Sequence, residues 1–363
     1  MKNIKKIPVY VISTFGHCGL DWLHSLLDSH KDILILPPLS FFRKISILKN
    51  KKVYLHSHLN HKIITNIITK ELFTKTNIVS YKILKKNQKK SIFQKHMNNF
   101  LKVEKDLSME KKIFFSIYYA FAKINKINLN KIKIIVTNEA NAWNCDKYIE
   151  YFNSKFVFLI RDPRATIAGS LRVFKRHKKV PINFKIDINL SRMISAQKFC
   201  KKIEKNKILI LKNEKIHHNL KAEMKKLSKY LGIKFNNSLL QSTFLGKKWI
   251  GESGYLSKID LKKPYPQNYY QEKNVEKRWR GFLNQKTILV IETIFEKLMI
   301  RYKYKFDNRL NFKLKFFGYL FLLFGFNEPN NIFLRVTNCI KNIIRRSFII
   351  LNPNLSRKFF NII

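Results

Sequence analysis

The pattern of apolar and polar residues near the N-terminus predicts a strand, a loop and a helix in that order. Residues 8–14 form a short, β-branched apolar run, which is typical of a buried strand. Residues 14–19 contain two glycines and predict a loop, and residues 20–30 carry apolar side chains at helical spacing. A second short strand is expected within 33–36, before two prolines. This order of elements begins a parallel α/β sheet.

The same reading predicts further strands and helices along the chain. Strands are expected at 78–84, 133–137, 155–160 and 208–211. Helices are expected at 92–103, 113–124, after Pro163, at 220–231 and at 287–302. The unbroken apolar run at 155–160 is typical of a strand that is buried on both faces. The predicted fold class is α/β, with a central parallel sheet flanked by helices.

The composition changes from Asn311 onward, where aromatic and aliphatic residues alternate with basic ones. We therefore divide the chain into a domain at 1–305 and a basic, apolar C-terminal appendage at 306–363. The apolar run at 316–326 is too short to span a bilayer. The appendage is expected either to lie on an anionic membrane surface or to pack on the domain. The basic residues considered for membrane contact are Lys313, Lys315, Lys341, Arg345 and Arg346.

The net charge indicates which classes of partner the protein attracts, and the cysteines indicate the cellular compartment in which it works. The chain has 72 Lys and Arg against 23 Asp and Glu, a net charge of +49. Such a field attracts anionic cofactors, anionic glycans, nucleic acid and anionic lipid. The four cysteines are scattered and have neither metal-site nor disulfide spacing. We expect reduced thiols in a cytoplasmic protein, attached peripherally to the inner face of a membrane if the appendage binds lipid.

The first candidate for chemistry is the loop that follows the first strand. Backbone N–H groups in such a loop, together with the positive end of the next helix, bind phosphate. The loop is not a Walker A sequence, because no Gly-Lys-Ser or Gly-Lys-Thr follows it. A structural turn is the alternative interpretation. The candidate ligand-binding residues are Phe15, Gly16, His17, Cys18, Gly19, Leu20 and Asp21.

The second candidate is Arg161-Asp-Pro-Arg164, which follows the strand at 155–160. Open α/β sheets bind ligands at the carboxyl ends of their strands. The guanidinium fork of Arg161 suits a phosphate. The alternative interpretation is a structural Arg–Asp pair at the start of a helix.

Together these motifs resemble those of the PAPS-dependent sulfotransferases, which use 3′-phosphoadenosine 5′-phosphosulfate. The family's phosphosulfate loop is similar to residues 14–30, and its 3′-phosphate motif is similar to residues 158–170. Later segments also resemble the family in order and spacing: 210–214, 249–253 and 275–280.

The resemblance implies a nucleotide-kinase-like P-loop fold and PAPS as co-substrate, with no metal. It implies that the loop, Arg161 and Ser170 bind PAPS. The Arg-Asp-Pro-Arg form resembles the glycan-modifying and bacterial branches, so the expected acceptor is a carbohydrate hydroxyl.

Several loop residues depart from the family's pattern. His17 stands where Lys or Arg is usual, Leu20 and Asp21 stand where Ser or Thr is usual, and Gly169 occupies the common serine position. His17 can donate a hydrogen bond and gains charge if it is protonated. The Asp21 carboxylate would repel phosphosulfate, unless it caps the helix or faces the acceptor. An inactive family member is therefore an open alternative.

Glu139 is the candidate general base, with His17 as the second catalytic residue. Glu139 lies 22 positions before Arg161, a separation that resembles that of the family's catalytic histidine. An ordinary polar strand end is the alternative. The rival bases are His56, His58 and His61. His217 and His218 lack a third ligand nearby in the sequence, so no metal site is expected.

Two other functions compete with this interpretation. A nucleotide-dependent phosphotransferase would use a similar scaffold, but the chain lacks a Walker Lys-Ser/Thr pair. The net charge also suggests a non-catalytic protein that binds nucleic acid or other anions. No zinc-finger, RNP or helix-turn-helix signature supports specific nucleic-acid binding.

Overall fold

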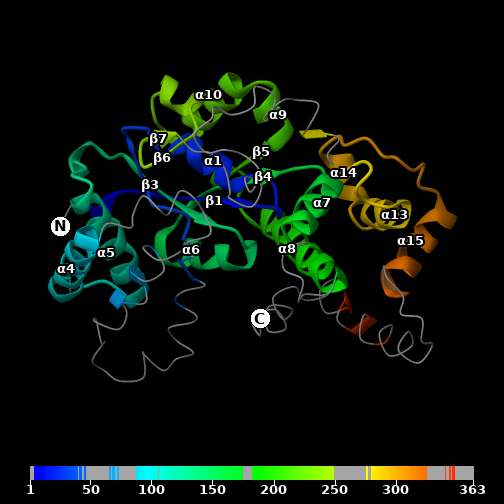
Figure 1. Cartoon of the computed structure of the whole chain (residues 1–363), viewed down its shortest axis with the longest axis horizontal. Helices are drawn as coiled ribbons and strands as arrows, with labels where there is room; N and C mark the ends of the chain where they lie inside the picture. Colours follow the sequence, from blue (N-terminus) through cyan, green and yellow to red (C-terminus); the bar gives the residue numbers. More distant parts are fainter. Residues whose placement is uncertain are drawn as a thin grey trace.

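The computed structural model describes residues 4–39, 87–104, 106–174, 182–248 and 279–324, with isolated positions between and after these ranges. At its centre lies a five-stranded sheet, in the order β2-β3-β1-β4-β5, whose neighbouring strands are all parallel (Figure 1). The predicted α/β class is thereby confirmed. The strands are β1 Val9–Thr14, β2 Ile33–Ile35, β3 Ile134–Glu139, β4 Lys155–Ile160 and β5 Ile208–Lys212.

The sheet buries β1 between two strands that come much later in the chain. Ser13 of β1 is paired in register with Glu139 of β3, and Thr14 of β1 is paired with Leu159 of β4. All six residues of β1 are buried, as a β-branched apolar run in the middle of a sheet should be. The chain leaves β1 toward β2 and later crosses back to β4, so the end of β1 is the topological switch point where such sheets bind ligands.

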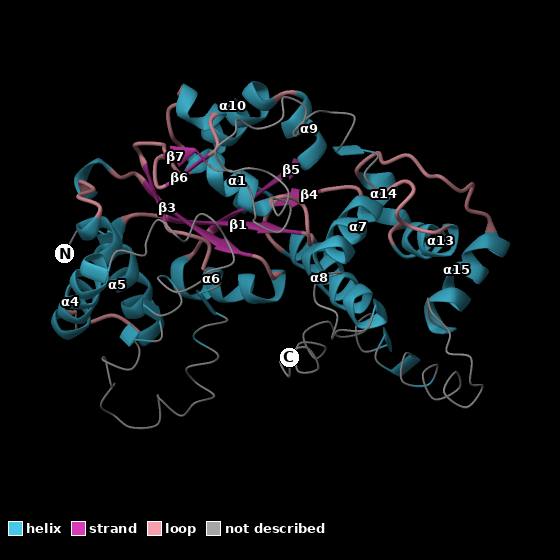
Figure 2. Ribbon diagram, viewed as in Figure 1, coloured by secondary structure: helices cyan, strands magenta, loops and turns pink. Residues whose placement is uncertain are grey.

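Helices cover both faces of the sheet (Figure 2). In this view α1, α9 and α10 lie above the strands, and α6 lies below them. A short hairpin, β6 Thr243–Phe244 and β7 Lys247–Lys248, follows α10. The helices are α1 Leu20–Leu27, α4 Asn87–Val103, α5 Met109–Ile124, α6 Cys145–Phe152, α7 Pro163–Phe174, α8 Ile182–Lys202, α9 Asn213–His218, α10 Leu220–Leu231, α13 Gln285–Ile294, α14 Glu296–Arg301 and α15 Phe312–Phe324.

The predicted helices at 92–103 and 113–124 begin earlier, as α4 and α5, and two other predicted helices differ at their ends. The helix predicted at 20–30 ends at Leu27, because His30 forms the turn into β2 instead. The His30 ring contacts the Lys234 carbonyl at 2.8 Å through Nε2 and accepts the Asp32 N–H at 3.2 Å through Nδ1. The helix predicted at 287–302 is divided into α13 and α14 at the buried Phe295.

The sequence analysis did not predict α6, α8, α9 or α15 as helices. The apolar pattern of α8 is weak because polar side chains occupy its buried face. Asp187, Asn189 and Ser191 are all fully buried there. The strand predicted at 78–84 and the histidines at 56, 58 and 61 lie outside the described residues.

The C-terminal segment remains in contact with the domain. Gly318 of α15 lies against Thr293 of α13, so closely that a Cβ at this position would clash with the Thr293 side chain. Arg346, one of the basic residues considered for lipid contact, is buried and pairs with Asp187 at 2.8 Å. Its assignment to a membrane surface was therefore wrong. Among the described residues, no helix is long and apolar enough to cross a bilayer.

Candidate functional site

The loop between β1 and α1 has the backbone of an anion-binding turn. Gly16 and Gly19 have φ of 132° and 88°, a region that only glycine adopts without strain. The Cys18 N–H donates to the Gly16 carbonyl at 2.9 Å, which folds the loop back on itself. Gly19 precedes α1 and supplies no capping side chain. The positive N-terminal end of α1 is therefore not capped by the residue that precedes it.

The loop is held tightly between α7 and α9. A Cβ at Gly16 would lie 2.9 Å from Thr166 Cγ2, and a Cβ at Gly19 would lie 2.7 Å from Asn213 Nδ2. Both distances are too short for a side chain, so glycine is needed for packing as well as for φ. Thr14 fixes the start of the loop, since its hydroxyl donates to the Gly16 carbonyl at 2.8 Å.

Arg161 lies at the end of β4, next to the loop. A Cβ placed at Gly169 of α7 would be 4.0 Å from Arg161 Nη1 and 3.9 Å from His17 Cβ. Gly169 is therefore the point where the loop and Arg161 meet. Nη2 of Arg161 donates to the Val275 carbonyl at 3.0 Å, while Nε has no hydrogen-bond partner among the described residues.

Ser170, predicted to assist Arg161, is fully buried and faces α8. Its hydroxyl accepts a hydrogen bond from Asn189 Nδ2 at 2.6 Å. Asn189 Oδ1 in turn lies 3.9 Å from a Cβ placed at Gly16. Ser170 therefore supports the loop through Asn189, and its direct contact with a phosphate stays a prediction.

His17 does not replace the positive charge of a loop lysine. Burial, together with the positive charges of the neighbouring Arg192 and Arg161, lowers the pKa of His17 to about 3. The ring is neutral at physiological pH and can only donate or accept a hydrogen bond. Arg192 of α8, which the sequence analysis missed, joins Arg161 as a source of positive charge. No local pattern marks it, because only the packing of α8 brings it to the loop.

The remaining loop residues have structural surroundings. Phe15 is buried and packs edge-on against Phe158. Cys18 lies 3.5 Å from the Thr166 hydroxyl, and burial raises the pKa of its thiol. Leu20 is the buried first residue of α1. Asp21 lies in the first turn of α1, where a carboxylate stabilises the positive helix end.

Glu139 lies at the end of β3 and is completely buried. Its Oε1 accepts the Asn141 N–H at 3.1 Å. The negative charge of Glu139 helps to raise the pKa of Cys145 and Tyr148, although burial contributes more in both cases. The Glu139 side chain therefore lies near α6, which carries Cys145 and Tyr148. Its role as the base stays a prediction.

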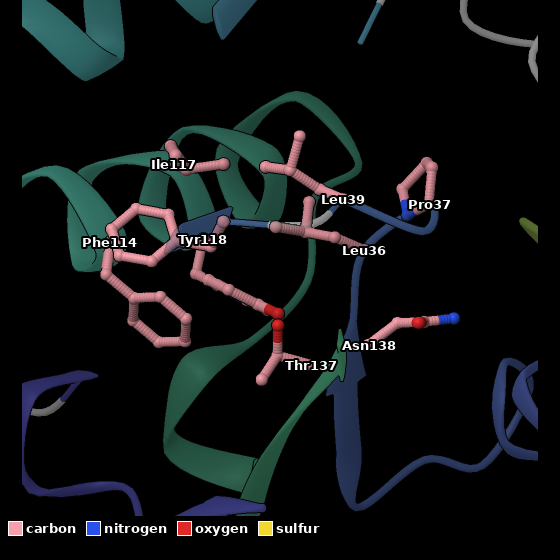
Figure 3. A pocket seen from close by; sticks show the side chains of 9 residues that line it. Leu36, Pro37, Leu39, Phe114, Ile117, Tyr118, Thr137 and Asn138 are labelled. Carbon is pink, nitrogen blue, oxygen red and sulfur yellow. The ribbon is translucent and has the colours of Figure 1, made fainter. Parts of the chain in front are cut away.

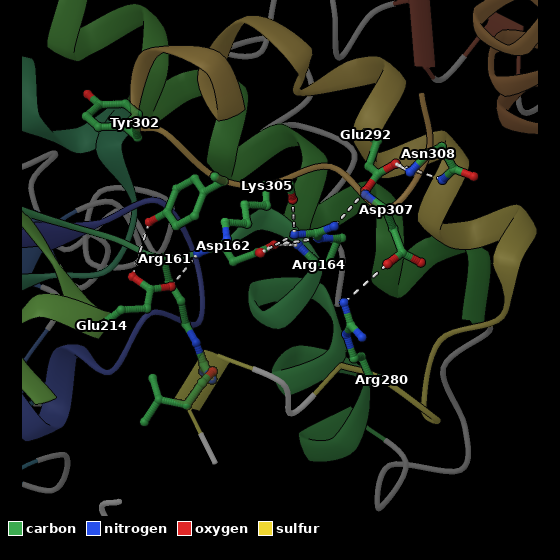
Figure 4. A network of polar contacts seen from close by, with 12 residues as sticks. Arg161, Asp162, Arg164, Glu214, Arg280, Glu292, Tyr302, Lys305, Asp307 and Asn308 are labelled. Atoms are coloured by element: carbon green, nitrogen blue, oxygen red, sulfur yellow. Dashed lines mark hydrogen bonds and ion pairs between the residues drawn. The ribbon is translucent and has the colours of Figure 1, made fainter. Parts of the chain in front are cut away.

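The second arginine of the motif has a structural role (Figure 4). The Arg164 guanidinium contacts the Asp162 carboxylate at 2.6 and 3.0 Å, and the Glu292 carboxylate at 2.6 Å. It also donates to the Lys305 carbonyl at 2.7 Å and stacks over the Trp279 ring at 4.2 Å. The Arg–Asp pair expected as an alternative is thus formed by Arg164 and Asp162, and the binding of a ligand by Arg161 stays a prediction.

Glu292 and Glu214 extend this network to both sides. Glu292 accepts the N–H groups of Asp307 and Asn308, at 2.7 and 3.1 Å. Glu214 accepts the Asp162 N–H at 2.9 Å and the Tyr304 hydroxyl at 3.2 Å. The network fixes the strand end that carries Arg161, and it crosses the domain boundary predicted at residue 305.

A small pocket lies beside the ends of β2 and β3 (Figure 3). The Tyr118 and Thr137 hydroxyls face each other, whereas the Asn138 amide points away from the apolar side chains. Tyr118 also donates to the Val136 carbonyl at 2.9 Å. The pocket is lined by Leu36, Pro37, Leu39, Phe41, Phe114, Ile117, Tyr118, Thr137 and Asn138.

No candidate metal centre emerges within the described ranges, where no three His, Cys, Asp or Glu side chains are grouped to hold an ion. His217 stacks on Trp22 with ring centroids 4.0 Å apart, and His218 lies 3.0 Å from Glu276. Cys18, Cys145 and Cys200 are buried free thiols.

His24 of α1 makes the stability of the fold depend on pH. The ring is 1% exposed and stacks on Phe244, and burial lowers its pKa from 6.5 to about 3. The unfolded chain therefore binds a proton near pH 6.5 that the folded chain does not. Above pH 6.5 His24 is neutral in both the folded and the unfolded chain. As the pH falls from 6.5 toward 3, only the unfolded chain gains the proton, so the free energy of unfolding decreases.

We expect His24→Leu to reduce the acid sensitivity of the fold. Between pH 7 and pH 5, the variant should lose about 2 kcal/mol less free energy of unfolding than the parent chain. Urea titrations at both pH values measure this difference. Equal losses would mean that His24 is protonated in the folded state.

Comparisons with known proteins identify the family of the chain. The model of the sulfotransferase family matches residues 16–237, more than half of the chain. In structure, the chain is similar to a sulfotransferase domain from the curacin biosynthetic pathway, with a TM-score of 0.52 and 13% identity over 83% of this chain and 99% of that one. A sulfotransferase domain from the Synechococcus PCC 7002 olefin synthase gives a TM-score of 0.49 and 12% identity, over 83% of this chain and 96% of that one. A search of curated proteins found no significant match.

Proposed function

The chain belongs to the sulfotransferase family, and on this premise we propose that it moves a sulfuryl group from PAPS to a carbohydrate hydroxyl. One observation carries the proposal. The loop after β1 and Arg161 after β4 come from paired strands, and they meet at Gly169. An open helix end and a guanidinium in one place suit a ligand with two separate phosphate groups.

In the proposed reaction the acceptor oxygen attacks sulfur, and the bond from sulfur to the 5′-phosphate oxygen breaks. Glu139 takes the proton of the acceptor hydroxyl. The N–H groups of the loop stabilise the charge that develops on the departing phosphate. Arg161 and Arg192 supply positive charge there, and neutral His17 contributes a hydrogen bond.

Two features support a carbohydrate acceptor. The Arg161-Asp-Pro-Arg164 motif resembles that of glycan-modifying branches of the family. The net charge of +49 draws anionic glycans toward the protein. Assays with PAPS and a panel of neutral oligosaccharides, anionic oligosaccharides and simple phenols test this choice. Transfer to phenols alone would contradict it.

The donor is tested by thermal shift with adenosine 3′,5′-bisphosphate, ATP and NAD. The bisphosphate at about 100 times its dissociation constant should stabilise the fold by ~2.7 kcal/mol. Stabilisation by ATP alone would favour the rival phosphotransferase.

Arg161→Ala should weaken bisphosphate binding by about 1.5–3 kcal/mol, the contribution of a charged hydrogen bond. Isothermal titration measures this change. Arg280→Ala is the matched control, because the exposed Arg280 side chain pairs with Asp307 and stacks on Trp279. Unchanged affinity in a folded Arg161→Ala variant would remove Arg161 from the site.

A further inference from the structure

Helix α15 presents two different faces. Gly318 and Leu322, four positions apart, are buried, with Gly318 packed against Thr293 of α13. Lys315 adds an ion pair to Glu296 of α14 at 2.7 Å. These contacts hold one face of the helix on the domain.

The other face exposes a row of aromatic side chains. Phe312, Phe316 and Tyr319 recur at helical spacing and are 88%, 54% and 51% exposed. Phe317 is also exposed and stacks on Phe321, with ring centroids 6.3 Å apart. Exposed large apolar groups that are contiguous mark an interaction surface. We call Phe312, Phe316, Phe317 and Tyr319 the aromatic face of α15.

The charged residues around the aromatic face indicate which kind of partner it binds. Between residues 309 and 350 the only acidic residue is Glu328. Exposed Lys313 lies on α15 itself, between the aromatic side chains. The basic residues of this segment are Arg309, Lys313, Lys315, Arg335, Lys341, Arg345 and Arg346. Aromatic groups beside cationic groups, with almost no acid, complement the interface of an anionic bilayer.

Exposed apolar residues also occur further along the same segment. Ile340, Ile343 and Ile344 have the spacing of one helical face and are 53%, 38% and 52% exposed. Arg346, in contrast, is withdrawn from the surface by its pair with Asp187. Among the described residues of the C-terminal segment, the exposed groups thus include Ile340, Ile343 and Ile344 but not Arg346.

We propose that the aromatic face of α15 docks the protein on the surface of an anionic lipid bilayer, with aromatic rings in the interface and Lys313 on the head groups. The helix lies in the plane of the membrane and remains packed on α13. This attachment is independent of the sulfuryl transfer proposed above, so each can fail without the other.

Vesicle sedimentation of the full chain tests the proposal. The probes are vesicles of phosphatidylcholine alone and vesicles of phosphatidylcholine mixed with phosphatidylserine. The parent chain should bind the mixed vesicles, and added salt should weaken binding. Phe312→Ser combined with Phe316→Ser should lower partitioning by about ten-fold or more, because two exposed rings leave the interface. Lys313→Gln should lower it by about five-fold.

Val103→Ser is the matched control. Val103 is 60% exposed at the end of α4, which lies at the opposite end of the molecule from α15 (Figure 1). The Val103→Ser variant should bind vesicles as strongly as the parent chain. All variants change exposed residues, and their unfolding curves verify that the fold is intact.

Three results would overturn the proposal. The parent chain could fail to bind mixed vesicles. The Phe312 and Phe316 variant could bind as well as the parent, which would leave only non-specific adsorption by net charge. The same variant could instead dissociate a dimer seen in analytical ultracentrifugation while vesicles have no effect, which would assign the face to a second copy of the chain.

Discussion

Arg164→Met should destabilise the fold by about 3–5 kcal/mol, because it leaves two buried carboxylates without their cation. Glu292 is completely buried and Asp162 nearly so, and both contact the Arg164 guanidinium at 2.6 Å. Methionine keeps much of the length of the side chain but none of the charge. The free energy of unfolding from urea titration measures the effect.

Lys202→Ala is the control for Arg164→Met. Lys202 pairs with Asp146 at 3.1 Å, but both side chains are exposed to solvent. Its removal should change the free energy of unfolding by less than about 1 kcal/mol. A loss for Arg164→Met that is no larger than this would show that the network does not hold the C-terminal segment in place.

Glu139→Gln should lower turnover by ~10²–10⁴-fold, because the amide keeps the shape of the side chain but cannot accept the acceptor's proton. The affinity for adenosine 3′,5′-bisphosphate should stay unchanged. Initial rates with saturating PAPS, together with titration of the bisphosphate, separate the two quantities.

The burial of Glu139 makes a structural role the main competing explanation. Its carboxylate supports the Asn141 N–H, and glutamine would still accept that hydrogen bond. Loss of turnover with an unchanged unfolding curve therefore identifies the base. Full activity of Glu139→Gln would transfer this role elsewhere, with the histidines at 56, 58 and 61 first in line.

The apolar pattern of the sequence was sufficient to predict the strands that carry the site. The run at 155–160 is β4, and its end places Arg161 as expected. The strand predicted at 133–137 continues to Glu139, because its buried polar end stays paired with β1 as far as Ser13. The loop at 14–19 was found because two glycines follow a β-branched run.

Tertiary packing determined what the sequence could not show. Arg192 contributes charge to the loop only because α8 packs against the loop. The sequence did not predict α8, because several residues on its buried face are polar. The neutrality of His17 depends first on its burial and then on two arginines from other elements, Arg192 and Arg161. The different roles of Arg161 and Arg164 became visible only with Glu292, which lies 128 positions after Arg164.

The same separation of 128 positions affects how the protein is made. When Asp162 and Arg164 leave the ribosome, their partner Glu292 has not been translated, and at bacterial or eukaryotic elongation rates it follows roughly ten seconds later. During that interval the sheet can assemble, but the guanidinium has only Asp162 to neutralise it. The strand end that carries Arg161 is therefore completed late, after the chain has passed Asn308. A nascent chain interrupted before this point would expose an incomplete site and would be a natural target for chaperones and proteases.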